Sequence, residues 1–346
     1  TNLLEAISLL APGRGFRGTR LADFAHKKRN NTDLAASGWG IATKLISPHG
    51  QIEIGTGLED QGTEGDLPSS DRRVVRINGN YVRGPAVLTE VVAVRWLTPA
   101  MDRMFTESAS RRRKFLDHLT AGIEPTHASR VSAYERTMRQ RSKLLKEQSL
   151  DLRWISALEE TLVQVGTAIA AQRLDYVARL GALINLKNPT PIADCRVSGD
   201  VEGWLQDEPA LEAEVRFRET LEKSRSRDAI LGGSVCGPHR SDLEVIHING
   251  MPAGQCSTGE QKTILLELFQ ADARLVSAAG SPPLLLLDEI SAHLDDKNRS
   301  EVFETILDMG AQAWATGTDA EFFNEFKDRA QFLKVVNGSV LTGSRS

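Results

Sequence analysis

The feature that most constrains this chain is a run of four leucines, Leu284–Leu287, followed directly by Asp288 and Glu289. Consecutive apolar residues of this kind are typical of a strand that is buried on both faces of a parallel sheet. In open α/β folds, ligands bind at the carboxyl ends of such strands. The pattern therefore predicts an α/β fold with two carboxylates at a ligand site. A buried strand that ends in a solvated acidic turn would explain the same residues.

Hydrolysis of a nucleoside triphosphate needs two acids with different roles at such a position. Asp288 would hold Mg²⁺, usually through water, because this ion combines few carboxylates with phosphate oxygens. Glu289 would orient and deprotonate the water that attacks the γ-phosphate. The pair is thus a candidate metal ligand and a candidate catalytic residue.

A second motif lies upstream, where the segment CSTGEQK at 256–262 opens a long amphipathic helix. The N-terminus of a helix offers unpaired N–H groups and the positive end of the helix dipole, and Ser257 adds a hydroxyl, so this turn suits an anion. A plain helix cap by Ser257 or Thr258, with Glu260 in the first turn, is the alternative. A capped helix that leads directly into the leucine strand favours a nucleotide site.

In this order the two motifs resemble the signature motif and the Walker B strand of ABC-class ATPases. The resemblance implies that ATP and Mg²⁺ are bound, and that Ser257, Gly259 and Asp288 contact the nucleotide. Two shorter segments fit the same class. Ser291 and Asp295 lie in SAHLD, which resembles the D-loop. After the next predicted strand, Thr318 or Asp319 stands where related ATPases carry the residue that senses the γ-phosphate.

The first residues, Thr1 and Asn2, precede a short apolar helix and look like the residues directly after the lysine of a phosphate loop. The resemblance implies that both bind the nucleotide and that the Thr1 hydroxyl ligates Mg²⁺. The lysine and the glycines of the loop would then precede Thr1. An arbitrary helix start is the alternative, and a Gly-x-x-x-x-Gly-Lys sequence immediately before Thr1 would distinguish the two.

Further segments resemble the RecF family in particular. They are the strand and proline at 94–99, Arg-Arg-x-Phe-Leu-Asp within 111–117, the helix at 133–145, and Gly-Pro-His-Arg-Ser-Asp-Leu at 237–243. Ala100 replaces an acidic residue that is common in the family, and Ser241 replaces an aspartate. The resemblance implies an α/β fold in which an ABC-type P-loop NTPase head, residues 1–98 and 236–346, is interrupted by an inserted α-helical arm, residues 99–235.

Residue periodicity predicts a similar organisation. Strands are expected at 39–46, 51–55, 73–77, 91–97, 192–197, 243–248, 284–287 and 312–315, and helices at 2–10, 110–120, 125–146, 150–186, 208–227 and 259–279. Hairpin turns are expected at Asn78-Gly79, Asn249-Gly250 and Asn337-Gly338. Mixed strands therefore flank a long helical middle.

Charge is distributed unevenly along the chain. The net charge is −4, yet residues 103–146 carry eleven Lys and Arg against four Asp and Glu, a local balance of +7 that leaves −11 for the rest. Such a segment could follow a nucleic-acid backbone. A solvated helical face, or internal ion pairs for Arg112 and Arg113, would explain the same charges. The DNA-binding candidates are Arg111, Arg112, Arg113, Lys114 and Arg139.

The resemblance also implies a function. Two heads would enclose ATP, each supplying Ser257 and Gly259 to the nucleotide held by the other, so that ATP drives formation of a homodimer around DNA. The family acts at gap junctions on single- and double-stranded DNA with RecR and RecO. It favours the loading of RecA, and it supports replication restart and the SOS response. This chain is therefore expected to be an ATPase when a phosphate loop is present.

Two other functions compete with this one. Without a Walker lysine, the chain could be a catalytically inactive remnant that binds DNA or a partner. An ATPase subunit of a transporter would need a switch histidine, which is not found, and would not explain the Arg-Arg-x-Phe-Leu-Asp segment.

The composition excludes several other classes. The three cysteines form no CxxC pair, so neither a disulfide framework nor a structural zinc site is indicated. No apolar run approaches the roughly 18 residues that a membrane helix requires. The start of the chain lacks the basic leader of a signal peptide. A cytoplasmic protein is expected.

Overall fold

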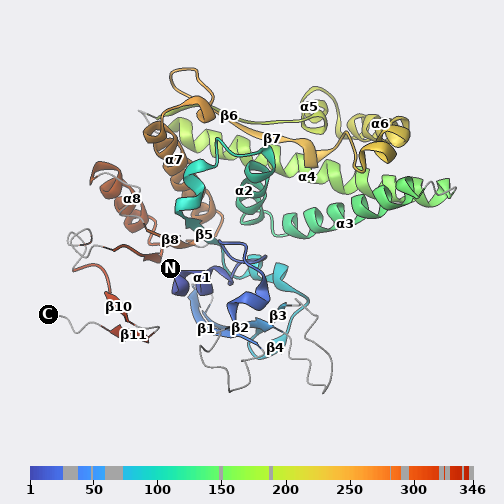
Figure 1. Cartoon of the computed structure of the whole chain (residues 1–346). Coiled ribbons are helices and arrows are strands. Elements are labelled where there is room, and N and C mark those ends of the chain that lie inside the picture. The colour runs from blue at the N-terminus through green and yellow to red at the C-terminus, as the bar shows by residue number, and fades with distance from the viewer. Residues whose placement is uncertain are drawn as a thin grey trace, which may run out of the picture.

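A three-stranded parallel sheet lies in the middle of the molecule (Figure 1) and consists of β5 (Val94–Leu97), β8 (Leu284–Leu287) and β9 (Ala313–Ala315) in that order. β8 is the central strand, and none of its four leucines is more than 8% exposed. The predicted buried strand is confirmed. The computed structural model describes residues 1–25, 38–47, 50–58, 73–147, 151–186, 190–280, 282–289, 296–318, 323, 328–336 and 339–342.

The leucines of β8 alternate between two hydrophobic cores. Leu284 and Leu286 pack in a cluster with Leu4 of α1 (Asn2–Ser8). Leu285 and Leu287 belong to a larger cluster that includes the inner face of α7 (Thr258–Ala278). Successive side chains of a strand point to opposite faces, so α1 and α7 cover the two sides of the sheet (Figure 1).

An antiparallel sheet packs against the α1 side. Its strands, in order, are β1 (Gly40–Ser47), β2 (Gly50–Leu58), β3 (Arg73–Ile77) and β4 (Asn80–Tyr81). Asn78 and Gly79 join the last two strands with φ angles of 50° and 81°. Two successive positive φ angles are what a type I′ hairpin turn requires, so the predicted turn is confirmed. Ile54 of β2 and Val75 of β3 pack in the same buried cluster as Leu4 of α1.

The middle of the chain is helical, as expected. Its helices are α2 (Ala109–Ala121), α3 (His127–Lys146), α4 (Leu152–Leu186), α5 (Asp200–Asp207) and α6 (Ala210–Leu231). The short helix α5 was not expected from the sequence. β6 (Ile192–Ser198) pairs antiparallel with β7 (Asp242–His247), so a two-stranded ladder joins the predicted arm to the predicted head.

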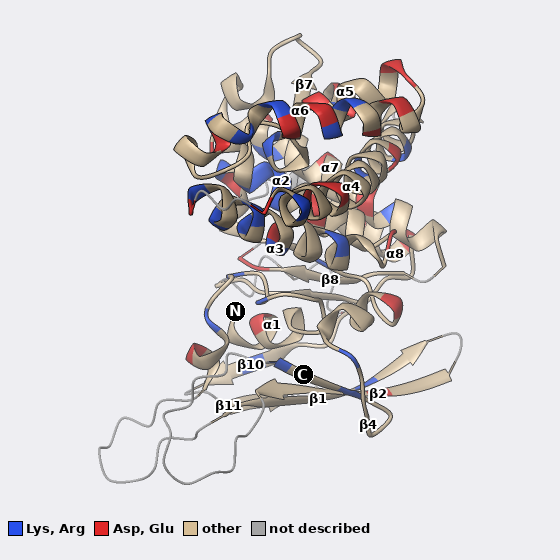
Figure 2. Cartoon of the chain, turned by 90° about the vertical axis from the view of Figure 1, so that its right-hand side faces the viewer, with Lys and Arg blue, Asp and Glu red and all other residues tan. Residues whose placement is uncertain are grey.

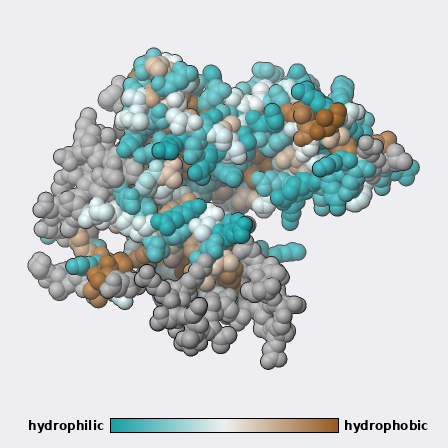
Figure 3. All heavy atoms as spheres, viewed as in Figure 1, coloured by the Kyte–Doolittle hydropathy of each residue, from teal (hydrophilic) through white to brown (hydrophobic). Residues whose placement is uncertain are grey.

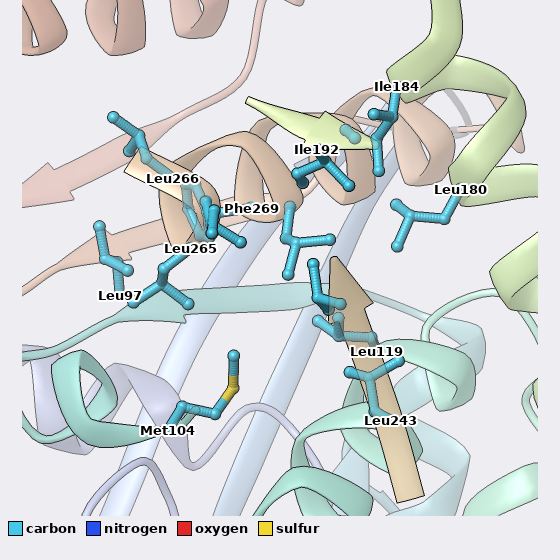
Figure 4. Close-up of a cluster of buried hydrophobic side chains, with 14 of the residues drawn as sticks. Leu97, Met104, Leu119, Leu180, Ile184, Ile192, Leu243, Leu265, Leu266 and Phe269 are labelled. Atoms are coloured by element: carbon cyan, nitrogen blue, oxygen red, sulfur yellow. The ribbon is translucent and has the colours of Figure 1, made fainter. Parts of the chain in front are cut away.

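One hydrophobic core extends across the predicted domain boundaries (Figure 4). Leu119 of α2 and Leu180 of α4 pack in the same cluster as Leu97, Leu243 and Leu265. The division into a head and an arm therefore stays a prediction about chain segments, because the two segments share a continuous buried interior.

A buried polar cluster also connects these elements. Arg95 of β5 forms an ion pair with Asp272 of α7, and it donates a hydrogen bond of 2.9 Å to the Leu119 carbonyl. The Tyr176 hydroxyl of α4 donates to Asp272 Oδ1 at 2.8 Å. Since Arg95 and Asp272 are almost fully buried, each needs these partners to offset its desolvation.

The remaining elements lie around these layers. They are α8 (Asp296–Asp308), β10 (Leu333–Val336), β11 (Ser339–Thr342) and the short 3₁₀ helices Leu21–Phe24, Pro85–Glu90, Pro99–Arg103, Pro238–Arg240 and Ala253–Gln255. β10 pairs antiparallel with β11, and the predicted Asn337-Gly338 turn lies outside the described residues. Within the described part of the chain, no helix combines the length and apolarity that crossing a membrane demands.

Basic and acidic residues alternate along the helices of the arm (Figure 2). One of them, Arg141 of α3, is completely buried and pairs with Glu159 at 2.9 Å and with Asp228 at 2.7 Å. Both carboxylates are themselves at most 2% exposed. This triad therefore holds α3, α4 and α6 together from inside.

Replacing Arg141 with alanine is expected to lower the free energy of unfolding by about 3 kcal/mol, because two buried carboxylates lose a partner. Arg139→Ala, on the exposed side of the same helix, is the matched control and should change it by less than about 0.5 kcal/mol. Urea denaturation followed by circular dichroism measures both. Equal losses in the two variants would contradict the role assigned to the triad.

Candidate nucleotide site

Asp288 and Glu289 lie at the carboxyl end of β8, as predicted. The Asp288 N–H donates to the Leu97 carbonyl at 2.9 Å, which continues the pairing with β5, and the residue is 6% exposed. Thr1 caps the start of α1, and its nitrogen lies 3.9 Å from Asp288 Oδ1. Thr1 and Asp288 are therefore neighbours, although they are 287 positions apart in the sequence.

A threonine that sequence reasoning did not single out contacts both acids. The Thr316 hydroxyl donates to Asp288 Oδ1 at 2.8 Å and accepts the Glu289 N–H at 3.0 Å. Glu289 is exposed and has a φ of 50°, a conformation that non-glycine residues adopt rarely. The position of Thr316 directly after β9, at the same edge of the parallel sheet, was the signal that could have identified it.

The residues at this edge fit Mg²⁺. The Asp288 carboxylate and the Thr1 hydroxyl are oxygen donors, which this ion prefers. In the part of the chain that the structure describes, no group of three His, Cys, Asp or Glu side chains could hold a metal ion. These two donors thus suit an ion that is completed by phosphate oxygens and water rather than by an all-protein cage.

The Ser257 turn at the start of α7 is a capping box. The Ser257 hydroxyl and N–H donate to Glu260 Oε2 at 2.7 and 2.8 Å, and the Glu260 N–H donates back to Ser257 Oγ at 3.3 Å. These hydrogen bonds from Ser257 lower the pKa of Glu260. Ser257 and Gly259 are nevertheless exposed, and a Cβ added at Gly259 would meet no atom within 4 Å. The alternative of a helix cap at Ser257 is therefore confirmed. The cap leaves the turn accessible at the surface.

The predicted D-loop and γ-phosphate sensor residues are not tested by the structure. Ser291, Asp295 and Asp319 lie outside the described residues. Thr318 is exposed, and its role as a γ-phosphate sensor stays a prediction.

Part of the basic segment serves the interior of the protein. Arg112 forms a bidentate ion pair with Asp242. Its Nε donates to Oδ1 at 2.7 Å and its Nη2 to Oδ2 at 2.6 Å, and this hydrogen bonding raises the pKa of Arg112. Arg113 donates to the Ser241 carbonyl at 2.7 Å, and burial lowers its pKa. The contact with Asp242 agrees with the alternative of an internal ion pair for Arg112, whereas Arg113 is held by a hydrogen bond to the backbone. Arg111, Lys114 and Arg139 are exposed and face solvent, although Arg111 also pairs with Glu107.

The aspartate that ends the Arg-Arg-x-Phe-Leu-Asp segment is also structural. Asp117 accepts hydrogen bonds of 2.8 Å from Arg173 and His127. Burial opposes its charge, but these two partners outweigh that effect and lower the pKa of Asp117. His239 of the second segment bonds to the Tyr134 hydroxyl at 3.0 Å and to the Ser234 carbonyl. Both segments thus fasten α2, α3 and α4 to the start of β7.

The chain therefore has an α/β fold with an ABC-type head and an inserted helical arm: a parallel sheet with an acidic pair at its tip, an exposed Ser-Gly turn on α7 and the inserted helices. The fold is similar to that of the solved structure of "the recombination mediator protein RecF-ATPrS in RecFOR pathway", with a TM-score of 0.82, 22% sequence identity, and coverage of 99% of this chain and 88% of that one. No family model matches the chain.

Similar proteins of known family identify the family of this chain. The chain is 45% identical over 345 residues to the DNA replication and repair protein RecF of Mesorhizobium japonicum, with 98% of this chain and 88% of that protein covered. The RecF protein of Brucella suis biovar 1 is 42% identical over 349 residues, with 99% and 87% covered. The chain belongs to the RecF family of DNA replication and repair proteins.

The capping box predicts a pH effect. Because the pKa of Glu260 is lowered in the folded protein, its charge stabilises the fold at neutral pH, and this contribution is lost as the pH falls through the lowered pKa. In Ser257→Ala, the pKa of Glu260 is expected to rise toward its ordinary value. Carboxyl ¹³C NMR titration measures it, and the internal control is Glu219 of α6, whose pKa is lowered by Lys223 on the same helix. A Glu260 pKa that is equal in both proteins would contradict the capping geometry.

Proposed function

We propose that this protein is an ATP-dependent, DNA-binding recombination mediator that acts in gap repair, replication restart and the SOS response. The observation that carries the proposal is the proximity of Thr1, at the start of α1, to Asp288 at the tip of β8. In a RecF-family protein with an ABC-type fold, this is the arrangement that a nucleotide site needs. The solved structures named for RecF with ATP and with ATPrS support the choice of nucleotide.

The chain's own residues divide the work at this site. Thr1 and Asp288 would hold Mg²⁺, and Asn2 would contact the nucleotide. Bound Mg²⁺ would neutralise charge on the β- and γ-phosphates. Glu289 would accept the proton of the attacking water, and its exposed position leaves room for that water.

A second copy of the protein would complete the site. Ser257 and Gly259 are exposed at a helix N-terminus, so they are free to contact a nucleotide that another molecule holds. ATP binding would then favour a homodimer, and hydrolysis would release it. Ser291 and Asp295 would lie at the same interface.

The remaining partners follow from the family. The solved RecF structure is described as part of the RecFOR pathway, which supports RecR and RecO as partners. We propose that the protein works with them in the cytoplasm at junctions of single- and double-stranded DNA and favours RecA loading there. Arg111, Lys114 and Arg139 are exposed cations of the basic segment, and we expect them to contact the DNA backbone.

Glu289→Gln, in protein expressed from its complete coding sequence, is expected to bind ATP and accumulate as a dimer. Its hydrolysis rate should fall by a factor of about 10² or more, because loss of a general base costs that much. Steady-state turnover and light scattering with ATP measure the two effects, and the exposed Glu304→Gln is the control. Hydrolysis at the normal rate would remove Glu289 from its role. Normal DNA binding without any ATP turnover in the unsubstituted protein would favour the inactive binding remnant instead.

Reversing the charges of Arg111, Lys114 and Arg139 to glutamate is expected to weaken DNA binding. The slope of log affinity against log salt concentration should flatten by about 0.9 for each duplex phosphate that the variant no longer neutralises. Fluorescence anisotropy at several salt concentrations measures the slope. Lys223→Glu, at an exposed cation of α6 outside the basic segment, is the control. An unchanged slope in the triple variant would return the basic segment to a purely structural role.

A further inference from the structure

Thr316 contacts three successive residues at the end of β8. Its N–H donates to the Leu287 carbonyl at 2.9 Å, its hydroxyl donates to Asp288 Oδ1 at 2.8 Å, and its hydroxyl oxygen accepts the Glu289 N–H at 3.0 Å. The first of these bonds continues the parallel pairing of β8 with β9. The other two are made by the side chain and reach the predicted metal ligand and the predicted catalytic residue.

The directions of these bonds are determined by chemistry. A backbone N–H can only donate, so the Thr316 oxygen must be the acceptor toward Glu289. An ionised carboxylate can only accept, so the single hydroxyl proton must point at Asp288. The result is a continuous chain from the Glu289 N–H through the Thr316 hydroxyl to Asp288 Oδ1, in which each bond strengthens the other.

The backbone of Glu289 needs this support. Within the described residues, Glu289 and Asn78 are the two non-glycine residues with positive φ, each at 50°. Asn78 lies in a hairpin turn, where such a conformation is ordinary. Glu289 lies at a strand end, where strain of this kind persists only when neighbouring groups hold it and often marks a functional site.

We propose that Thr316 is a positioning residue for both acids: its hydroxyl proton orients the Asp288 carboxylate, and its oxygen holds the left-handed backbone that presents Glu289 to solvent. This inference rests on the proposed function. It adds a residue after β9 whose hydroxyl couples the metal ligand to the catalytic base, so that one side chain sets the geometry of both.

The test separates the contribution of the hydroxyl from that of the shape of the side chain. Thr316→Val keeps the β-branched shape, Thr316→Ala removes the bulk, and Thr316→Ser keeps the hydroxyl. Removing the hydroxyl is expected to lower kcat for ATP hydrolysis by about tenfold or more, since a hydrogen bond to a charged group is worth about that factor. It should also raise the Mg²⁺ concentration needed for half-maximal rate, while the KM for ATP changes by less than about threefold. Thr316→Ser should stay within about threefold of the unsubstituted protein in all three quantities.

Three comparisons decide the outcome. Thr316→Ser that is as slow as Thr316→Val would show that the shape of the side chain matters rather than its hydroxyl, and would overturn the proposal. A normal kcat in both Thr316→Val and Thr316→Ala would also overturn the proposal. Thr318→Val is measured as well, and a kcat that falls only in this variant would have the same consequence. Thr161→Val, at an exposed position of α4, controls for the loss of a threonine hydroxyl elsewhere.

Measuring Glu289→Gln beside these variants separates the two hypotheses. If Glu289→Gln is slow and Thr316→Val is not, the proposed function stands and the positioning role fails. If Glu289→Gln hydrolyses ATP normally, the proposed function fails, and the role of Thr316 fails with it.

Discussion

Burial of β8 on both faces is the constraint on which the rest of the structure depends. Two of its leucines pack on the α1 side and two on the α7 side. A slip that moved Asp288 into the place of Leu287 would bury its carboxylate in an apolar core, which is costly. Asp288 and Glu289, which follow the leucines, are therefore held at a defined position at the carboxyl end of the sheet. Their neighbours at that edge are the start of α1 and the end of β9, and a nucleotide site can form between them.

The same interior links this site to the helical arm. α7 begins at the exposed Ser257 turn, and its buried Asp272 is tied to Arg95 of β5 and to Tyr176 of α4. Buried charges of this kind resist separation, because each would be left unpaired in a medium of low polarity. Hydrophobic contacts across the predicted boundary also join α4 to α7.

The surface of the arm is less uniform than its charge count implies. Arg112, Arg113 and Arg141 are bonded to other groups of the protein, and acidic residues lie between the basic ones along the helices (Figure 2). Apolar side chains also reach the surface, and one group lies over α5 and α6 (Figure 3), where Leu211 and Val215 are exposed. Net charge along a sequence therefore overstates the basic surface that a helical segment offers to DNA.

The sequence by itself determined the elements whose cause is local. Four adjacent leucines specify a doubly buried strand, Asn78-Gly79 specifies a tight hairpin turn, and Ser257 with Glu260 specifies a helix cap, because each effect acts within a few residues. Only the tertiary structure decided that Thr316 bonds to Asp288, that Arg112 pairs with Asp242, and that α4 and α7 share one core. These contacts join residues that are far apart in the chain. Local periodicity carries no information about which distant partner a side chain meets, since that depends on how the completed layers pack.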